Sequence, residues 1–499
     1  MTRTILALPV DGRPVTCDQV ALLAESAGWQ LLLPPSDLLG RMRAAGDRDR
    51  LAAWLLDNAA KAEGLVISID TLVYGGLVPS RLSNEDEGAL AGRLDVMLEL
   101  RRRHPRLPIT VFAATMRISN NNHAEEERPY WAEHGSAIWR WSHHVDRHAV
   151  LGELADEQAA EELVERIPAA VLADYRAVRA RNFAITDRVL NLAADGVVDF
   201  VVLPQDDTAP FGVNVAERRA LVRRAKEIGI ANRVMSFPGA DEVIWTQVAR
   251  LIARAEGVMP SFALDWNEPT AAAALVARYE DRPIGETVAA QIGAVGGVVV
   301  NERDSETVAL FLHTAGSEQG EWALDLWPGE PRPGLDAAWL GRLATLIETS
   351  SAVALVDLAN ANGGDPVAIA AIGECASIDR LLAYAGWNTA GNSIGSVVAL
   401  CAVPLRDRDA QRRLLATRFV DDLVYQAGCR QEIRAAGVDV STTSGAAWAA
   451  DTVFRPRADV WLAANGFSDL TVGDAWFPWG RTFEIGFTIE NRMTAGAPA

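Results

Sequence analysis

The chain has little cysteine. Four cysteines, Cys17, Cys375, Cys401 and Cys429, are spread over 499 residues, and no two of them form a C-x-x-C pair. This spacing argues against a disulfide framework and against a zinc site built from cysteine thiolates. We therefore expect all four side chains to act as small buried apolar groups.

The sequence also lacks long apolar runs and an excess of positive charge. No apolar run is long enough to span a bilayer, and the first residues show no signal core with a small-residue cleavage site. The formal net charge is −19, which opposes binding to nucleic acid or to an anionic membrane. We therefore expect a cytoplasmic protein with neither nucleic acid nor membrane as a partner.

Nucleotide and metal signatures are missing as well. There is no G-x-x-x-x-G-K-[ST] motif, and no G-x-G-x-x-G follows the first predicted strand. His143, His144 and His148 have no carboxylates or cysteines at ligand spacing, so they favour a solvated helix over a metal site. We expect neither a cofactor nor a metal.

What the sequence does contain is a regular alternation of apolar strands and helices. The length exceeds the size at which single cores stop growing, so several lobes are expected. Alternating strands and helices imply a parallel sheet with right-handed crossovers. We predict an α/β fold with a mainly parallel sheet. A (β/α)8-like barrel is the first alternative and an open doubly wound sheet is the second.

We divide the chain into four segments by composition. They are an N-terminal α/β catalytic region (1–256), a middle α/β segment with a Gly/Pro/Glu-rich loop (257–336), the C-terminal part of the α/β core (337–452), and a small β-rich closing element with the tail (453–499).

The most informative stretch is an apolar strand that begins at Phe200 and stops at Asp206-Asp207, before a Pro/Gly turn. Adjacent carboxylates repel each other, so one of the two can have a raised pKa and act as a general acid. The plainer interpretation is a turn followed by a helix cap. We predict Asp206 and Asp207 as the catalytic pair because similar strand ends recur along the chain.

Four other predicted strands end in Asp11, Asp70, Arg117 and Asp241. The carboxyl ends of parallel strands meet at one edge of a sheet, where α/β proteins place their chemistry. These side chains should therefore converge and line an active or binding site.

Further polar residues follow these strand ends, and amides suit sugar hydroxyls because each offers donors and an acceptor. A second segment, Ala385-Gly-Trp-Asn-Thr-Ala-Gly-Asn392, places an indole and two amides among small residues. The substrate-binding set that we predict is Asp11, Arg13, Asp70, Tyr74, Arg81, Arg117, Asn120, Asp241, Trp387, Asn388 and Asn392.

Several motifs together resemble one bacterial family, catalogued as domain of unknown function 4127. They are Leu8-Pro-Val-Asp-Gly-Arg-Pro14, Asp70 with Tyr74-Gly-Gly-Leu-Val-Pro-Ser-Arg81, Asp206-Asp207, Tyr384-Ala-Gly-Trp-Asn-Thr389, and Pro478-Trp-Gly-Arg-Thr-Phe-Glu484. The resemblance covers nearly the whole chain and carries no assigned activity. Such proteins accompany sugar uptake and processing, which implies a carbohydrate role.

The Asp-Asp pair with a downstream asparagine is also similar to retaining hexosaminidases that use the acetamide group of their substrate. That similarity implies that Asp206 orients the acetamide, that Asp207 is the general acid/base, and that Asn388 binds the sugar.

We therefore expect a carbohydrate-active hydrolase that uses paired carboxylates on a small sugar or glycoside, such as an N-acetylhexosaminide. One alternative is a Mg²⁺- or Mn²⁺-dependent hydrolase or isomerase with Asp11, Asp70, Asp206 and Asp357 around the metal. Another is a non-catalytic cytoplasmic sugar-binding protein. The expected partner is a small carbohydrate, and the oligomeric state is left open, with a homo-oligomer as one option.

Overall fold

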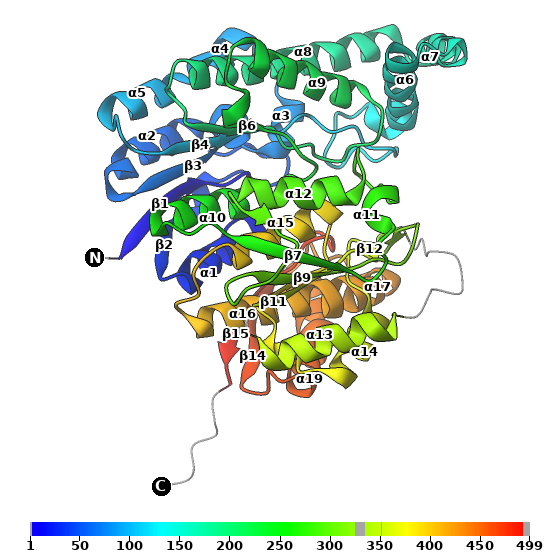
Figure 1. The fold of residues 1–499 in the computed structure, drawn as a ribbon. Helices are drawn as coiled ribbons and strands as arrows, with labels where there is room; N and C mark the ends of the chain where they lie inside the picture. The colour runs from blue at the N-terminus through cyan, green and yellow to red at the C-terminus, as the bar shows by residue number, and fades with distance from the viewer. Residues whose placement is uncertain (1, 325–334, 351, 493–499) are drawn as a thin grey trace. The chain divides into compact units, whose positions relative to one another are not determined.

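The computed structural model describes residues 2–324, 335–350 and 352–492 (Figure 1). Residues 325–334 of the predicted loop and 493–499 of the predicted tail lie outside them. The chain divides into two compact units. Unit 1 comprises 1–12, 30–247 and 279–282, and unit 2 comprises 13–29, 248–278 and 283–499.

Unit 1 is built on a six-stranded sheet with the order β2-β1-β3-β4-β5-β6. All pairs from β1 to β6 are parallel. The strands are β1 (Arg3–Leu8), β2 (Trp29–Leu32), β3 (Gly64–Ser68), β4 (Ile109–Phe112), β5 (Phe200–Val202) and β6 (Val234–Met235). Every residue of β3, β4 and β5 is buried, which explains why these strands appear in the sequence as unbroken apolar runs.

Helices connect the strands of unit 1. They are α2 (Arg48–Asn58), α3 (Leu77–Leu82), α4 (Glu87–Gly92), α5 (Asp95–Arg103), α6 (Trp131–Leu151), α7 (Leu154–Arg166), α8 (Ala169–Ala194) and α9 (Val213–Glu227). Helices α6 and α7 lie side by side (Figure 1). Together with α8 they share a core around Trp131, Ile138 and Tyr175, so the long connection between β4 and β5 has apolar packing of its own.

Unit 2 has a five-stranded parallel sheet with the order β13-β11-β9-β7-β8. Its strands are β7 (Ser261–Trp266), β8 (Val298–Val299), β9 (Val308–His313), β11 (Val353–Asp357) and β13 (Ala383–Ala385). Two small pairs are added, the parallel β10 (Gly320–Glu321) with β12 (Asn360–Ala361) and the antiparallel β14 (Leu470–Trp476) with β15 (Gly486–Asn491).

The helices of unit 2 include α1, which comes from near the N-terminus. They are α1 (Asp18–Ser26), α11 (Ala271–Ala274), α12 (Ile284–Ala294), α13 (Ala337–Thr349), α14 (Pro366–Cys375), α15 (Ala390–Cys401), α16 (Arg408–Phe419), α17 (Arg430–Ala435), α18 (Thr443–Trp448) and α19 (Arg455–Ala464). Helix α10 (Val243–Glu256) begins in unit 1 and ends in unit 2.

The two large sheets follow one rule. If the strands of each sheet are numbered in chain order, the sheet of unit 2, read from β8 to β13, has the spatial order 2-1-3-4-5. The sheet of unit 1 has the same order and adds β6 as a sixth strand. This is the order of a doubly wound fold, whose ligands bind outside the carboxyl ends of the strands. A mainly parallel α/β fold and a small C-terminal β-rich element are therefore confirmed.

Each of the two units combines stretches that are far apart in the sequence. Unit 1 covers most of 1–256, and unit 2 combines most of 257–499 with 13–29. Residues 13–29 belong to unit 2 because α1 packs against α16. There Arg413 binds Glu25 (2.9 Å) and Arg418 binds Gln19 (2.7 Å).

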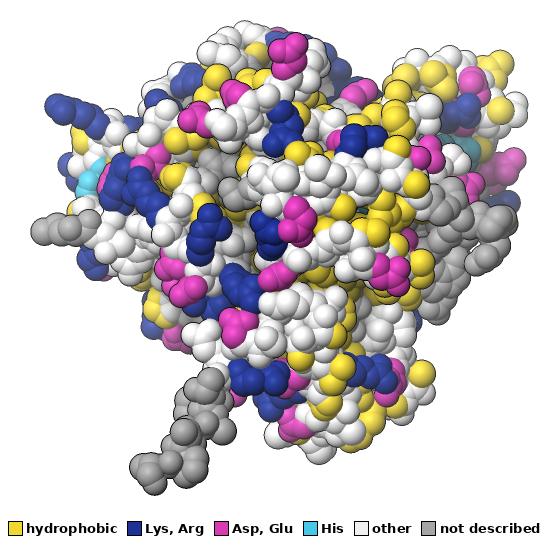
Figure 2. All heavy atoms as spheres, turned by 60° about the horizontal axis from the view of Figure 1, so that its bottom comes forward, with side chains coloured by type: hydrophobic (Ala, Val, Ile, Leu, Met, Phe, Trp, Pro, Cys, Tyr) yellow, Lys and Arg dark blue, Asp and Glu magenta, His cyan; other side chains and the backbone are white. Residues whose placement is uncertain are grey.

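Three cysteines are buried as predicted, but Cys375 is exposed at the end of α14, so the expectation of four buried thiols is wrong for this residue. No helix in the described parts of the chain is long and apolar enough to cross a bilayer. On the face shown in Figure 2, basic side chains are interspersed with acidic ones, so the acidic excess is not segregated there.

Candidate functional site

Asp70 lies directly after β3, where the chain enters a short π-helix (Asp70–Tyr74). Thr71 fixes this turn to the end of the neighbouring strand by donating a hydrogen bond from Oγ1 to the main-chain oxygen of Pro9 (2.6 Å). The Asp70 carboxylate is buried and accepts a hydrogen bond from the Ala114 N–H (2.9 Å), just past β4. Asp70 is thereby held between the ends of β3 and β4.

Arg81 joins three carboxylates beside Asp70. It lies on α3 and is 1% exposed. Its Nη2 donates to Asp206 Oδ2 (2.6 Å), and its Nη1 contacts Glu126 (3.2 Å) and Glu127 (3.3 Å). Asp206 follows β5, so Arg81 links elements that are far apart in the sequence.

Arg117, which follows β4, forms a second bridge. Its Nη1 donates to Asp207 Oδ2 (3.0 Å), its Nε donates to Glu127 (2.8 Å), and its Nη2 contacts Glu126 (3.1 Å). We call this group the carboxylate–arginine cluster. Its members are Asp70, Arg81, Arg117, Glu126, Glu127, Asp206 and Asp207.

The cluster contains five carboxyl groups and only two guanidinium groups. Burial raises the pKa of Asp70 to about 7, and the nearby charge of Asp206 adds to the shift. Burial also raises the pKa of Asp207 to about 7, with Arg117 opposing the shift and Asp206 adding to it. Both groups are therefore protonated for part of the time near neutral pH.

Asp207 is held in an unusual backbone conformation, with φ at 27°. The chain before it is anchored because Gln205 bridges to both Thr115 and Pro238. The chain after it is anchored by a hydrogen bond from the Thr208 N–H to the Tyr279 oxygen (3.0 Å). Strained residues of this kind cluster at functional sites, where the surrounding structure over-determines them.

These features give the two adjacent aspartates different surroundings. Asp206 accepts a short charge-assisted hydrogen bond from Arg81, which holds its side chain in place. Asp207 has a raised pKa, and its side chain remains 24% exposed, so it can give a proton to a bound molecule. This pairing is suited to general acid catalysis next to a fixed carboxylate.

The donor set offers little to a metal ion. Within the described ranges, no group of three or more His, Cys, Asp or Glu side chains is arranged to hold one. The metal-dependent alternative gains no support from the geometry.

The remaining predicted residues of unit 1 have varied surroundings. Tyr74 is buried, its hydroxyl has no hydrogen-bond partner among the described residues, and Arg181 lies over its ring (5.8 Å). Asp11 and Asp241 are buried beyond the ends of β1 and β6. Asn120 is exposed.

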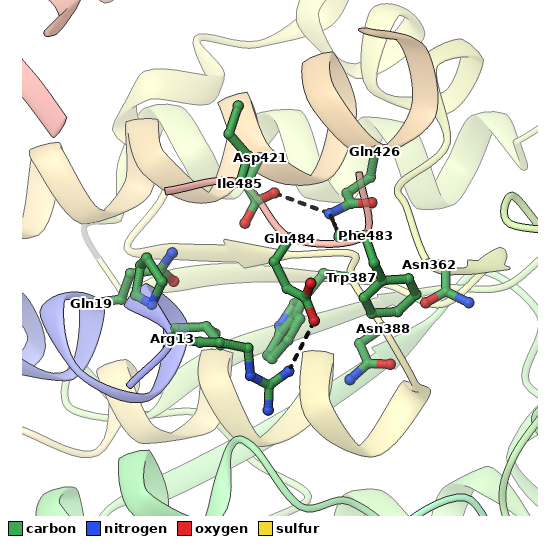
Figure 3. Close-up of a pocket in the computed structure, with 12 residues that line it drawn as sticks. Arg13, Gln19, Asn362, Trp387, Asn388, Asp421, Gln426, Phe483, Glu484 and Ile485 are labelled. Atoms are coloured by element: carbon green, nitrogen blue, oxygen red, sulfur yellow. Dashed lines mark hydrogen bonds and ion pairs between the residues drawn. The ribbon is translucent and has the colours of Figure 1, made fainter. Parts of the chain in front are cut away.

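Unit 2 contains a pocket formed entirely by its own residues (Figure 3). Its volume is about 440 Å³ when the space at its open mouth is included. The lining comprises the aromatic rings of Trp387 and Phe483, the amides of Gln19, Asn362, Asn388 and Gln426, the charged groups of Arg13, Asp421 and Glu484, and the apolar side chains of Pro14, Val15 and Ile485. We call it the unit 2 pocket.

Glu484 is the best-anchored charge in this pocket. Arg481 holds its carboxylate by two hydrogen bonds (2.8 and 2.5 Å), and Arg13 lies 3.8 Å away on the pocket side (Figure 3). Trp479 lies under both guanidinium groups, with Arg13 at 4.6 Å and Arg481 at 4.9 Å from its ring centre. The charges are therefore paired and stacked, as buried charges must be.

A ten-residue π-helical segment (Val420–Cys429) forms another wall. It carries Asp421 and Gln426, and Gln426 donates to Asp421 (3.4 Å) and to the main-chain oxygen of Phe483 (3.1 Å). Burial raises the pKa of Asp421, against the effect of Arg418, and burial raises the pKa of Asp422 to about 8. Segments of π-helix are rare in proteins, and those that occur often lie at functional sites.

Three of the four predicted residues of unit 2 lie in this pocket. Arg13, Trp387 and Asn388 line it, whereas Asn392 does not. Asn392 is buried in the first turn of α15, where its side chain donates to Thr389, the residue that caps the helix (2.9 Å). Its position in a helix start, rather than in a loop, accounts for the difference.

The sequence did not indicate several residues of either group. Glu126 and Glu127 lie in an irregular segment without periodicity, although an acidic run that begins eight residues after Arg117 was a usable signal. Gln426 was not predicted, and Glu484 was noted only as the last residue of the motif Pro478–Glu484. The contacts of Gln426 with Phe483 and of Glu484 with Arg13 join elements that no local pattern connects.

Comparison with known proteins agrees with the breadth of the motifs. A family model described as "Protein of unknown function (DUF4127)" matches residues 5–488. A search of curated proteins found no match.

Proposed function

The chain belongs to the DUF4127 family of unknown function, and from its geometry we propose that it is a carbohydrate-active hydrolase that uses Asp206 and Asp207 on a small sugar or glycoside. The observation that supports this most is the raised pKa of Asp207, about 7, next to a carboxylate that Arg81 holds in place. Glycosidic bond cleavage commonly needs two carboxyl groups, one of which can give a proton to the leaving oxygen.

In the proposed reaction, protonated Asp207 gives its proton to the glycosidic oxygen while the bond from that oxygen to the anomeric carbon breaks. Asp206 stabilises the positive charge that develops on the sugar ring. Water then adds to the anomeric carbon, and its proton returns to Asp207. For an N-acetylhexosaminide, Asp206 would instead orient the acetamide group that attacks the anomeric carbon.

Arg81 and Arg117 act as positioning residues in this proposal. Each binds one aspartate of the pair and also contacts Glu126 and Glu127. The cluster therefore keeps the pair in place without substrate. A cytoplasmic location and a carbohydrate as the partner remain parts of the same proposal.

The test is turnover of chromogenic glycosides, including N-acetylhexosaminides, by the purified chain. Asp207→Asn should lower kcat/KM by at least about 100-fold, the usual contribution of a general acid, without loss of folding. The wild-type rate should fall as the pH rises above about 7, because the acid loses its proton there.

Asp195→Asn is the matched control, since Asp195 is exposed at the end of α8. It should leave kcat/KM unchanged. A substrate that is cleaved equally well by Asp207→Asn and by the wild type would remove the proposal. Loss of activity with EDTA would favour the metal-dependent alternative.

A further inference from the structure

The unit 2 pocket contains features that the proposed hydrolysis does not use. We propose that it is a binding site for a small uncharged polyhydroxylated molecule, a monosaccharide or a cyclic polyol. This proposal depends only on the residues of unit 2 and does not rest on the proposed activity of Asp206 and Asp207.

The first argument is backbone strain. Only five described residues other than glycine have a positive φ, and two of them, Asn362 (60°) and Asn388 (48°), line this pocket. The Asn362 N–H donates to the Asn388 oxygen (2.8 Å), so the two strained residues hold each other. A strained pair that meets at one cavity is expected where side chains must be aimed at a ligand.

The second argument is the kind of groups in the lining. Sugar hydroxyls both donate and accept hydrogen bonds, and amides do the same. The rings of Trp387 and Phe483 provide apolar surface on which the C–H face of a sugar ring can pack (Figure 3). Arg418 lies over the Trp387 ring (4.9 Å) and Arg430 lies over the Phe483 ring (4.6 Å), so both rings are held in place.

The third argument is charge, which selects a neutral ligand. In the lining, Arg13 faces Glu484 at 3.8 Å, a distance that leaves room for a hydroxyl to bridge the two groups. Arg418, behind the lining, is engaged with Asp421 and Asp422. An added phosphate or ammonium group would therefore meet charges that already have partners.

Isothermal titration calorimetry of the full chain tests the proposal. The neutral ligands are D-glucose, N-acetyl-D-glucosamine and myo-inositol, and the charged comparators are glucose 6-phosphate and glucosamine. At least one neutral ligand should bind with a Kd below about 1 mM. Absence of binding by all three up to about 10 mM would overturn the proposal. Tighter binding of a charged comparator than of its neutral parent would overturn it too.

Two variants locate the site. Asn388→Gly removes the amide at a position where glycine adopts the observed φ without cost, so the fold is kept. It should weaken binding by about tenfold, as expected for the loss of a ligand hydrogen bond. Glu484→Gln should weaken binding as well, because it removes the charge that faces Arg13.

Met42→Gly is the control for the backbone change, since Met42 also has a positive φ (51°) and lies in unit 1. It should leave the Kd unchanged. If Asp207→Asn abolishes binding and Asn388→Gly does not, the sugar occupies the carboxylate–arginine cluster and the unit 2 proposal fails. If the reverse holds, the proposal stands whatever the outcome of the glycoside screen.

Discussion

In unit 1 Asp207 follows the parallel strand β5, and in unit 2 Asp357 ends the parallel strand β11. The sheets share a strand order, yet the two carboxyl groups have different surroundings. Asp207 accepts a hydrogen bond from Arg117 (3.0 Å), and its side chain is 24% exposed. Asp357 is 1% exposed and accepts hydrogen bonds from the Asp365 N–H (2.6 Å) and the Tyr384 hydroxyl (3.3 Å).

If Asp207 is the proton donor that we propose, this difference separates a reactive strand end from a structural one. Both carboxyl groups have a pKa raised by burial, so a perturbed pKa alone does not identify the reactive group. What differs is the use of the carboxyl oxygens. The groups that donate to Asp357 belong to unit 2 itself, and these hydrogen bonds fix the turn at Gly364 and Asp365. The Asp207 side chain, in contrast, faces a partly open space.

The largest stability effect should come from removing Asp357. Asp357→Ala leaves the Asp365 N–H and the Tyr384 hydroxyl buried without an acceptor, which should lower the free energy of unfolding by about 3 kcal/mol. Asp207→Ala should change it by less than about 1 kcal/mol, because its surroundings are partly solvated. Urea unfolding of the two variants measures the difference between these free energies. An equal decrease in both variants would contradict the distinction between the two strand ends.

A second, smaller effect concerns the packing above Asp357. A Cβ at Gly364 would meet the Tyr384 hydroxyl at 2.3 Å and Leu423 at 2.8 Å. Gly364→Ala should therefore lower the free energy of unfolding by about 2 kcal/mol. Gly341→Ala is the matched control, because Gly341 lies in α13 with nothing within 4 Å of the added carbon, and it should stabilise by about 0.5 kcal/mol. A thermal melt in which both variants behave alike would show that the turn is not tightly packed.

The smallest effect depends on pH and concerns unit 1. Burial raises the pKa of Asp70 from 3.8 to about 7, so the folded state binds this proton more tightly than the unfolded chain does. The resulting stability is fully present below about pH 4 and is lost as the pH rises through about 7. Asp70→Asn carries no titrating proton. It should therefore reduce the difference in unfolding free energy between about pH 6 and pH 8 by about 1–2 kcal/mol. An unchanged difference would mean that Asp70 has an ordinary pKa.

Much of the fold follows from the sequence because strand ends are local signals. The apolar runs before Asp70, Asp206 and Asp357 have the length and composition of buried parallel strands, and the structure has strands there. The meeting of Asp70 with Asp206 follows from the rule that parallel strands share an edge. The hydrogen-bond partners of each carboxylate cannot be predicted in this way. A carboxylate at a strand end looks the same in sequence whether or not its oxygens already accept hydrogen bonds within the fold.

Long-range pairs account for most of what the sequence could not predict. Arg418 and Gln19 bind each other across 399 positions, and no periodicity links their segments. Phe483 and Glu484 line the unit 2 pocket, and hydrogen bonds from Tyr425 and Gln426 to the main-chain oxygens of Thr482 and Phe483 hold their segment there.

The placement of α1 in unit 2 has a consequence for biosynthesis. Helix α1 (Asp18–Ser26) leaves the ribosome early, whereas its partner α16 (Arg408–Phe419) leaves almost 400 residues later. At roughly 5–20 residues per second, α1 waits on the order of 20–80 s for its packing surface. The nascent chain must therefore keep one amphipathic segment unpaired while the whole of unit 1 is made. Neither unit is a continuous stretch of sequence, so no single truncation of the chain yields a complete unit.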